Sequence, residues 1–589
     1  MLNMATRTGA VHVARIRSSH VDKAGQRHQY ESVYLRRSYR QDGKVKHEQV
    51  ANLSALPAAA VTAVEAILAG TELVPAGPGT MAITRSLPHG AAAAVWAQAK
   101  TLGLPGLLGP PGRSRDLAVA LIMSRVLRPA TKLTTLGGWS DTTLGADLGV
   151  NDASTDEVYA AMEWLLGRQD SIEAKLAARH LRAQAGPARM ALFDLSSSWM
   201  TGRHCPLAAR GYSRDGKKGL PQIEYGLLTD PDGRPVAVRV FGGNTADPTS
   251  FLTAVDLVRK TFRLNEMVMV GDRGMITSAR IEALRKLPGL GWLTCLRAPA
   301  IAALAADQGP PRMSLFDTHN FAEISHPDYP GERLIACHNP VLAEERGRKR
   351  EALLTATENV LAPIAAAVAA GRLTGADAIG VRAGKAIGRY KMAKHLDVAI
   401  TDTTISITRR QAQIDAEAGL DGIYVIRTSL AAGTLEPGGI VDAYKDLCHV
   451  ERDFRTMKAT DLDMRPIHHR LADRVRAHVL LVTLAAYLVW HLRRAWAPLT
   501  YTDETPPQRQ DPVAPAQRSE HADRKASRHR DEDDQPVYTL RGLLDHLATL
   551  TRNHIQLPTG HHLDLLTTPT PAQRRAFELI GAPIPLTIG

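Results

Sequence analysis

The chain has 589 residues, of which 44% are hydrophobic, 22% charged and 5% aromatic, a composition typical of a globular protein and not of a disordered one. Its net charge of +12 favours a polyanionic partner, although charge alone does not distinguish nucleic acid from an anionic membrane. The four cysteines form no C-x-x-C pair, which argues against a disulfide framework or a zinc site and fits a reducing cytoplasm.

Residues 1–75 are predicted to form a basic, strand-rich region. Three segments alternate in the manner of strands ("VHVARIRS", "YESVYLRRSYR" and "KVKHEQVANL"), and "QDGK" at 41–44 indicates a hairpin turn. Residues 1–56 hold ten Lys and Arg against four acids, a local charge of +6. This region either contacts DNA or is a solvated basic surface.

Residues 76–185 are predicted to be helical. A capping box, Ser154-x-x-Glu157, begins a helix with an apolar stripe at Val158, Met162 and Leu165. The preceding helix and the "GVND" turn make the pair similar to a helix-turn-helix, which would place the second helix in a major groove. Ordinary helix pairs have the same pattern, so both interpretations stay open.

Residues 186–298 read as strands and then as alternating helix and strand. The apolar runs "MALFDLSSSW" (190–199) and "MVMVGDRGMI" (267–276) contain Asp194 and Asp272. A turn would explain Asp272, but an unpaired acid within a buried strand is costly, and two such acids suggest a shared cation. Three meandering strands followed by helix, strand, helix and strand predict an α/β fold with the first half of a ribonuclease H-like core.

Residues 299–430 interrupt this order and are predicted to be an insertion domain. It carries two basic stretches, "ERGRKRE" (345–351) and "GKAIGRYKMAKH" (384–395), and we expect Arg348, Lys349 and Arg350 to contact DNA phosphates.

The remaining chain is predicted to be helical over 431–500 and then to form a linker and a short helical tail over 501–589. The apolar run 477–490 spans only 14 residues, too few to cross a membrane, and is expected to be a buried core helix in a soluble protein. Residues 505–536 are Pro-rich with six basic and seven acidic residues, which is typical of a mobile linker.

The segment 440–462 supplies a third acid. On a continuous helix, Tyr444, Leu447, Glu451 and Lys458 fall within an arc of roughly 60°. An apolar stripe that includes Val450 and Phe454 lies beside this arc, so Glu451 would stand at the rim of the core, whereas Asp453 would face solvent. An amphipathic helix with boundary charges is the alternative.

Together these blocks resemble the DDE transposases of bacterial insertion sequences, in the subgroup with the signature Y-x2-R-x3-E-x6-K. Tyr444, Glu451 and Lys458 keep every spacing of that signature, with Leu447 in the place of the arginine. The blocks "LFDLSSS" and "VMVGDRGM" match those of the family's first and second acids, and the resemblance covers about residues 186–500. The family's insertion corresponds to the 179 residues from Asp272 to Glu451.

The resemblance implies a catalytic centre in which Asp194, Asp272 and Glu451 hold Mg²⁺, with Mn²⁺ as a substitute. Tyr444 and Lys458 would bind phosphates, and Arg273 would either contact DNA or balance Asp272. The expected partners are terminal inverted repeats and target DNA, bound by a homodimer or higher multimer at the nucleoid of a bacterial cytoplasm, with no membrane. A metal-dependent nuclease without strand transfer and a catalytically decayed DNA-binding protein are the alternatives.

Overall fold

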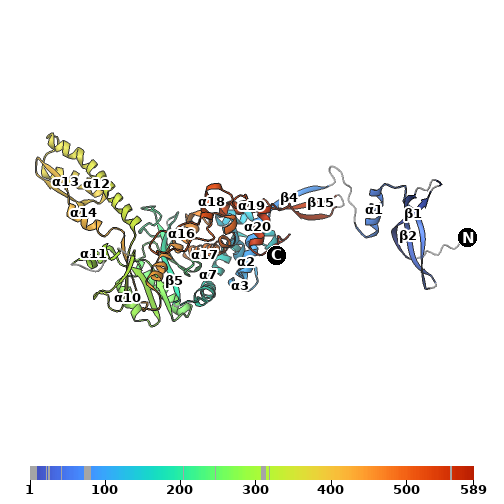
Figure 1. The fold of residues 1–589 in the computed structure, drawn as a ribbon, viewed down its shortest axis with the longest axis horizontal. Coiled ribbons are helices and arrows are strands. Elements are labelled where there is room, and N and C mark those ends of the chain that lie inside the picture. The colour runs from blue at the N-terminus through green and yellow to red at the C-terminus, as the bar shows by residue number, and fades with distance from the viewer. Residues whose placement is uncertain are drawn as a thin grey trace. The chain divides into compact units, whose positions relative to one another are not determined.

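The computed structural model describes residues 9–21, 23, 27–41, 43–71, 81–186, 188–202, 204–245, 247–306, 313–316, 319–557 and 560–588. The chain divides into two compact units, one of Met1–Ser86 with Arg552–Leu566 and one of Leu87–Thr551 with Thr567–Gly589. Figure 1 shows the elements of both, and each unit is described by itself.

The first unit contains an antiparallel sheet in the order β1-β2-β3, packed on one face against helix α1. These elements are β1 (Ala10–Val21), β2 (Arg27–Gln41), β3 (Lys44–Asn52) and α1 (Ala58–Leu68). Val33, Leu53 and Val61 form the core between sheet and helix. Gln41 pairs with Lys44, which confirms the predicted hairpin, while Arg7, Asp22 and Asp42 of the charge count lie outside the described residues.

A second three-stranded sheet has the order β16-β15-β4 and joins distant parts of the sequence. Its strands are β4 (Ala82–Pro88), β15 (Thr551–Gln556) and β16 (His562–Leu566). Thr84 Oγ1 donates to the carbonyl of His554 at 3.1 Å. The prediction of a purely helical tail was therefore wrong, and the predicted domain boundary at 75 lies outside the described residues.

The predicted helical region is confirmed between β4 and the central sheet. Its helices are α2 (Gly90–Thr101), α3 (Leu104–Leu108), α4 (Arg113–Leu127), α5 (Lys132–Gly138), η1 (Trp139–Asp141), α6 (Thr143–Asp147), α7 (Thr155–Leu166), α8 (Gln169–Ala177) and the π-helical turn η2 (Ala178–Arg182). Helix α7 has the predicted capping box between Ser154 and Glu157, and its stripe of Val158, Met162 and Leu165 is buried.

The candidate helix-turn-helix has features that do not suit DNA reading. Helix α6 has only five residues, and the exposed positions of α7 include Asp156 and Glu163, which would repel phosphates. Arg113 pairs with Glu157 at 3.1 Å, and Arg474 pairs with Glu163 at 3.3 Å. These contacts are those of an ordinary helix packed within the unit.

The second unit is built around an eight-stranded sheet in the order β10-β11-β14-β9-β8-β5-β6-β7. Its first five strands in sequence are β5 (Met190–Trp199), β6 (Gln222–Thr229), β7 (Pro235–Gly242), β8 (Met267–Val270) and β9 (Leu290–Cys295). Strands β5, β6 and β7 are antiparallel neighbours, whereas β8 is parallel to both β5 and β9. The helices between these strands are α9 (Asp247–Asp256), the π-helical η3 (Leu257–Thr261) and α10 (Ser278–Arg285).

The predicted insertion is only partly a separate domain. Strands β10 (Phe321–Ile324), β11 (Arg333–His338) and β14 (Ile423–Thr428) extend the sheet beyond β9. Strand β14 is antiparallel to β9, β11 to β14 and β10 to β11. They join it because they bury apolar side chains such as Leu334 and Val425, together with α11 (Ala298–Ala305) and η5 (Met313–Phe316).

The middle of the insertion forms its own small core. Figure 1 shows its long helices α12 and α13 side by side. Its elements are α12 (Pro340–Ala369), α13 (Ala376–Tyr390), η6 (Ala393–His395), β12 (Leu396–Ile400), β13 (Ile405–Arg409) and α14 (Gln411–Ala418). Leu354, Leu361, Ala383 and Leu396 are buried between them.

The helical region after β14 is broken where a continuous helix was predicted. It consists of α15 (Pro437–Lys445), α16 (Leu447–Arg455), the π-helical turn η7 (Thr456–Thr460), α17 (Ala472–Ala495) and η8 (Ala497–Leu499). Asp446 separates α15 from α16, and residues 461–471 lie outside any helix. The structure then continues with α18 (Glu520–Arg528), α19 (Leu540–Ala548) and, after β16, α20 (Pro571–Leu579).

The prediction of a mobile linker at 505–536 was wrong. Val513 is fully buried, and Lys525, 1% exposed, donates to the carbonyls of Ala497 and Thr502 and to Glu504. Asp511 accepts a hydrogen bond from Asn320 at 2.7 Å. The charges that suggested a solvated linker are instead paired locally and against the rest of the unit.

Two described helices, α12 and α17, are long and apolar enough to cross a membrane by length and composition. In α17, 83% of the most apolar window is buried within the protein, as expected for a core helix, whereas in α12 the share is 22%. Helix α12 nevertheless carries Glu351 and Glu358, both paired with Arg409. Length and composition alone are weak evidence for a membrane span.

Candidate active site

Strands β5 and β8 bring the first two predicted acids to the same position along neighbouring strands. They run parallel, with Leu192 opposite Val270. Asp194 and Asp272 each lie two residues further along, and neighbouring strands are about 4.8 Å apart. The sequence placed Asp194 within a strand and Asp272 at the end of one, and the register of β5 with β8 makes them neighbours.

Asp194 is half-buried, and its environment disfavours the carboxylate form. Burial, with a smaller contribution from the negative charges of Asp272 and Glu451, raises the pKa of Asp194 to about 7. The hydrogen bond from the Leu195 backbone and the positive charge of Arg214 act in the opposite direction. The charges of Asp272 and Glu451 therefore both act on Asp194.

Asp272 lies in a tight turn directly after β8. Its Oδ1 accepts hydrogen bonds from the backbone amides of Gly274 and Met275, both at 2.9 Å. The alternative interpretation of "DRG" as a turn is thus correct for the backbone. The second carboxylate oxygen is not used in these bonds, so the turn fixes the side chain without using all of its acceptor capacity.

Glu451 is exposed on helix α16, which lies on the same face of the sheet as Asp194. Tyr225 pairs with Ser196, so it shares the face of Asp194, and its ring meets that of Phe454 edge-on at 5.6 Å. Val450, Phe454 and Met457 are buried as predicted. Burying this stripe leaves Glu451 at the rim of the core.

The donor set suits hard divalent cations, which prefer carboxylate oxygens. Among the described residues, no three His, Cys, Asp or Glu side chains converge as the ligands of a single ion would. A two-ion centre does not require this, because each ion can take two of the carboxylates and complete its shell with DNA oxygens and water. Burial and, to a smaller extent, the negative charges of Asp272 and Glu451 raise the pKa of Asp194, and a cation bound there would offset both effects.

Tyr444 does not share a helix with Glu451, because α15 ends before Asp446 and α16 begins after it. Its hydroxyl forms a side-chain hydrogen bond with Cys295 at the end of β9. Burial raises the pKa of both groups, that of Cys295 to about 12. The predicted common arc of Tyr444, Leu447, Glu451 and Lys458 was therefore wrong, although the charge of Asp272 still reaches Tyr444.

Lys458 points into the protein, whereas it was predicted to be free to bind a DNA phosphate. Its side chain is 10% exposed, and Nζ donates to Asp215 Oδ1 at 2.9 Å. Burial lowers the pKa of Lys458, while Asp215 acts to raise it. The π-helical turn η7 explains the difference, because a wider turn changes the direction of the side chains that follow it.

Two buried acids were missed or misjudged from the sequence. Asp215, with a side chain 2% exposed, accepts from Lys458 and from Arg465 Nη1. Asp453, predicted to face solvent, is 7% exposed, and burial raises its pKa. The many charged residues in "YSRDGKKG" were the feature of the sequence that could have indicated an ion pair at Asp215.

The predicted DNA-contacting cations have different environments. Arg273 is exposed, and so are Arg348 and Lys349 on α12. Arg350 instead donates both guanidinium nitrogens to Asp421, at 3.2 and 2.5 Å, and is 11% exposed. Its pairing leaves the Arg350 guanidinium less available to phosphates than those of the exposed cations, so its role in DNA contact stays a prediction.

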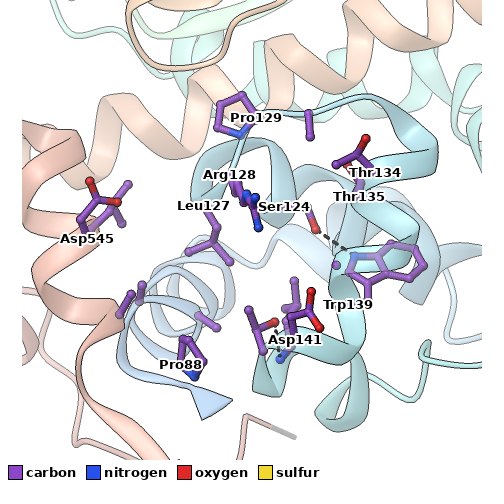
Figure 2. A pocket seen from close by; sticks show the side chains of 18 of the residues that line it. Pro88, Ser124, Leu127, Arg128, Pro129, Thr134, Thr135, Trp139, Asp141 and Asp545 are labelled. Carbon is purple, nitrogen blue, oxygen red and sulfur yellow. Dashed lines mark hydrogen bonds between the residues drawn. The ribbon is translucent and has the colours of Figure 1, made fainter. Parts of the chain in front are cut away.

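A cavity of about 460 Å³ lies in the helical region, between α2, α4, α5 and α19. Figure 2 shows its lining, in which Trp139 donates to Ser124 and the acids Asp141 and Asp545 stand on different elements. None of the three carboxylates of the candidate site lines this cavity.

Comparison with known proteins gives two family matches. Residues 196–488 match the model of the transposase DDE domain, and residues 20–74 match that of the N-terminal domain of the IS1634 family of transposases. The first match includes Asp272 and Glu451 and begins two residues after Asp194. No curated protein matches the chain.

Proposed function

Since this chain belongs to the DDE transposases of insertion sequences, we propose that it binds the terminal inverted repeats of its element, cleaves their phosphodiesters and joins the 3′-hydroxyl ends to target DNA. The observation that carries the proposal is that Asp194 on β5 and Asp272 in the turn after β8 each lie two residues beyond the paired residues Leu192 and Val270, with Glu451 close enough to raise the pKa of Asp194. The strand order β7-β6-β5-β8-β9 supports a ribonuclease H-like core, whose sheet the insertion extends.

Asp194, Asp272 and Glu451 would hold two Mg²⁺ ions, or Mn²⁺ in their place. Bound there, the ions would activate the attacking hydroxyl and stabilise the leaving oxygen of an in-line displacement. The protein's own contribution is positional, because the turn amides hold Asp272 and the buried stripe of α16 fixes Glu451. Tyr444 and Arg273 would lie beside the DNA. The chain is proposed to belong to the subgroup of these transposases that has the signature Y-x2-R-x3-E-x6-K.

The test uses the full chain and the DNA segments that flank its own coding sequence. Asp194→Asn, Asp272→Asn and Glu451→Gln should each lower Mg²⁺-dependent cleavage by at least about 100-fold while DNA binding persists, because charge stabilisation is commonly the largest catalytic contribution. Asp442→Asn, an exposed acid on α15, is the matched control and should cleave normally.

A carboxylate variant that cleaved at the wild-type rate would exclude that residue from the centre. Joined product on a target plasmid distinguishes a transposase from a nuclease that only cuts. DNA binding without any cleavage by the wild-type chain would favour a decayed DNA-binding protein.

A further inference from the structure

The loop that joins β5 to β6 holds an aromatic ring in water. Tyr212 is 79% exposed, the highest value among the large hydrophobic side chains of the described residues. A single exposed ring is common on protein surfaces, so what this ring can do depends on how its loop is held and on the charges around it.

The backbone on both sides of Tyr212 is clamped, which excludes a loose loop. Gln222, 1% exposed, donates its Nε2 to the carbonyl of Tyr212 at 3.0 Å and to that of Gly243 at 2.9 Å. A Cβ atom added at Gly211 would lie 2.1 Å from the Gly243 carbonyl oxygen, so the chain passes against its neighbour with no room for a side chain. The ring is therefore exposed while its backbone is fixed.

A second anchor ties the same loop to the catalytic elements. Asp215 accepts from Lys458 at 2.9 Å and from Arg465 at 2.5 Å, and its other oxygen accepts from the Trp199 amide at 3.4 Å. The Arg214 amide donates to Ser197 Oγ at 3.0 Å. The loop is thus fastened to β5 a few residues beyond Asp194 and to the turn that follows the helix of Glu451.

A cation of the same loop lies beside the ring. The guanidinium of Arg214 lies 5.8 Å from the centroid of the Tyr212 ring, and the Arg214 backbone amide is bonded to Ser197, three residues beyond Asp194 on β5. Lys217 and Lys218 are exposed on the same loop. An aromatic face with cations around it is the chemistry that binds unpaired nucleotides, since every base has a stacking face and every linkage a negative charge.

We propose that Tyr212 is the stacking platform for an unpaired base of the DNA strand whose phosphate lies at the carboxylates, with Lys217 and Lys218 on the neighbouring phosphates. This inference rests on the proposed function and deepens it, because it assigns a binding site for the single-stranded end. In a blunt duplex every base is paired and only the outer face of each terminal pair is free, whereas an unpaired base can leave the stack and lie against the ring, so the site favours an unpaired end.

Binding in the absence of divalent metal tests this with the full chain. The probes are a blunt duplex and the same duplex with a short unpaired 3′ extension that carries 2-aminopurine. Wild-type protein should bind the extended probe more tightly and quench its fluorescence. Tyr212→Ala should bind the extended probe about 5- to 100-fold more weakly, with unchanged affinity for the blunt one.

Tyr212→Phe should behave as wild type, because it retains the ring. Leu220→Ala, 42% exposed on the same loop but without a ring, is the matched control and should change neither affinity. Equal affinities of wild type for the two probes, or equal losses on both in Tyr212→Ala, would overturn the proposal. Since no metal or cleavage is involved, this outcome is separate from failure of the catalytic variants.

Discussion

The carboxyl group of Asp194 lies where two effects oppose its ionisation, burial in the sheet and the charges of Asp272 and Glu451. Both are unfavourable in the free protein and would be relieved by a cation. A strongly perturbed acid among other acids is typical of a functional site and is hard to explain as packing.

Because of Asp194, the free energy of unfolding should depend on pH and on bound metal. Its pKa is about 7 in the folded chain against an ordinary 3.8, so the folded state keeps a proton that the unfolded state has lost. Stability should fall as pH rises from about 4 to 7, by on the order of a few kcal/mol. Asp194→Asn should remove this dependence.

At pH 8, where the wild-type carboxylate is charged, Mg²⁺ at a hundredfold excess over its Kd should stabilise the chain by about 2–3 kcal/mol. Thermal unfolding measured across this pH range gives the pH dependence, and unfolding at pH 8 with Mg²⁺ or with chelator gives the stabilisation by Mg²⁺. An equal Mg²⁺ shift in Asp194→Asn would place the bound ion elsewhere.

Lys458 shows how one residue can satisfy a spacing and still have another role. It keeps the family position relative to Glu451, yet it is bonded to Asp215. Sequence spacing could not reveal this, because Asp215 lies 243 positions away and the π-helical turn is not visible in the apolar pattern. The strands with Asp194 and Asp272 could be predicted because their apolar runs are continuous.

At the scale of elements, long periodic segments were predictable and their connections were not. The succession of strands and helices along residues 190–295 and the capped helix α7 follow from local patterns. The pairing of β14 with β9, however, joins residues more than 120 positions apart, and nothing in the local pattern specifies it. The segment 505–536 was mistaken for a linker because its charges are satisfied by partners in the fold that composition does not show.

The basic run on α12 should divide into two functional parts. Arg348 and Lys349 are exposed, so replacing both by Gln should reduce the slope of log affinity against log salt by about 1–2. Titration of DNA binding at several salt concentrations measures this slope.

Arg350→Gln is the neighbouring control. Loss of its paired hydrogen bonds to Asp421 should cost about 2 kcal/mol of stability and leave the slope unchanged. A slope that changed only in Arg350→Gln would reverse the assignment of these cations.

At the scale of the whole molecule, the chain separates a basic sheet from the carboxylates. Strands β1–β3 belong to one compact unit and Asp194, Asp272 and Glu451 to the other. Val33 packs toward α1, so Arg36 and Arg40 lie on the opposite face of their strand and are available for DNA. If the first unit binds DNA and the second cuts it, as proposed, one subunit could bind an end that another subunit cuts.

We expect the active protein to be a multimer on paired ends, because an element moves only if both of its ends are cut and joined to one target. Two-fold symmetry matches inverted repeats. A mixing experiment tests this with Glu451→Gln and an Arg36→Gln, Arg40→Gln variant, each inactive alone. If binding and catalysis come from different subunits, random pairing should restore cleavage to about a quarter of the wild-type level, since half of the dimers are mixed and each cuts one end. Glu451→Gln mixed with Asp272→Asn is the control and should stay inactive, because both changes affect the same centre in each subunit. A monomer that cleaved isolated ends at the full rate would contradict the expectation.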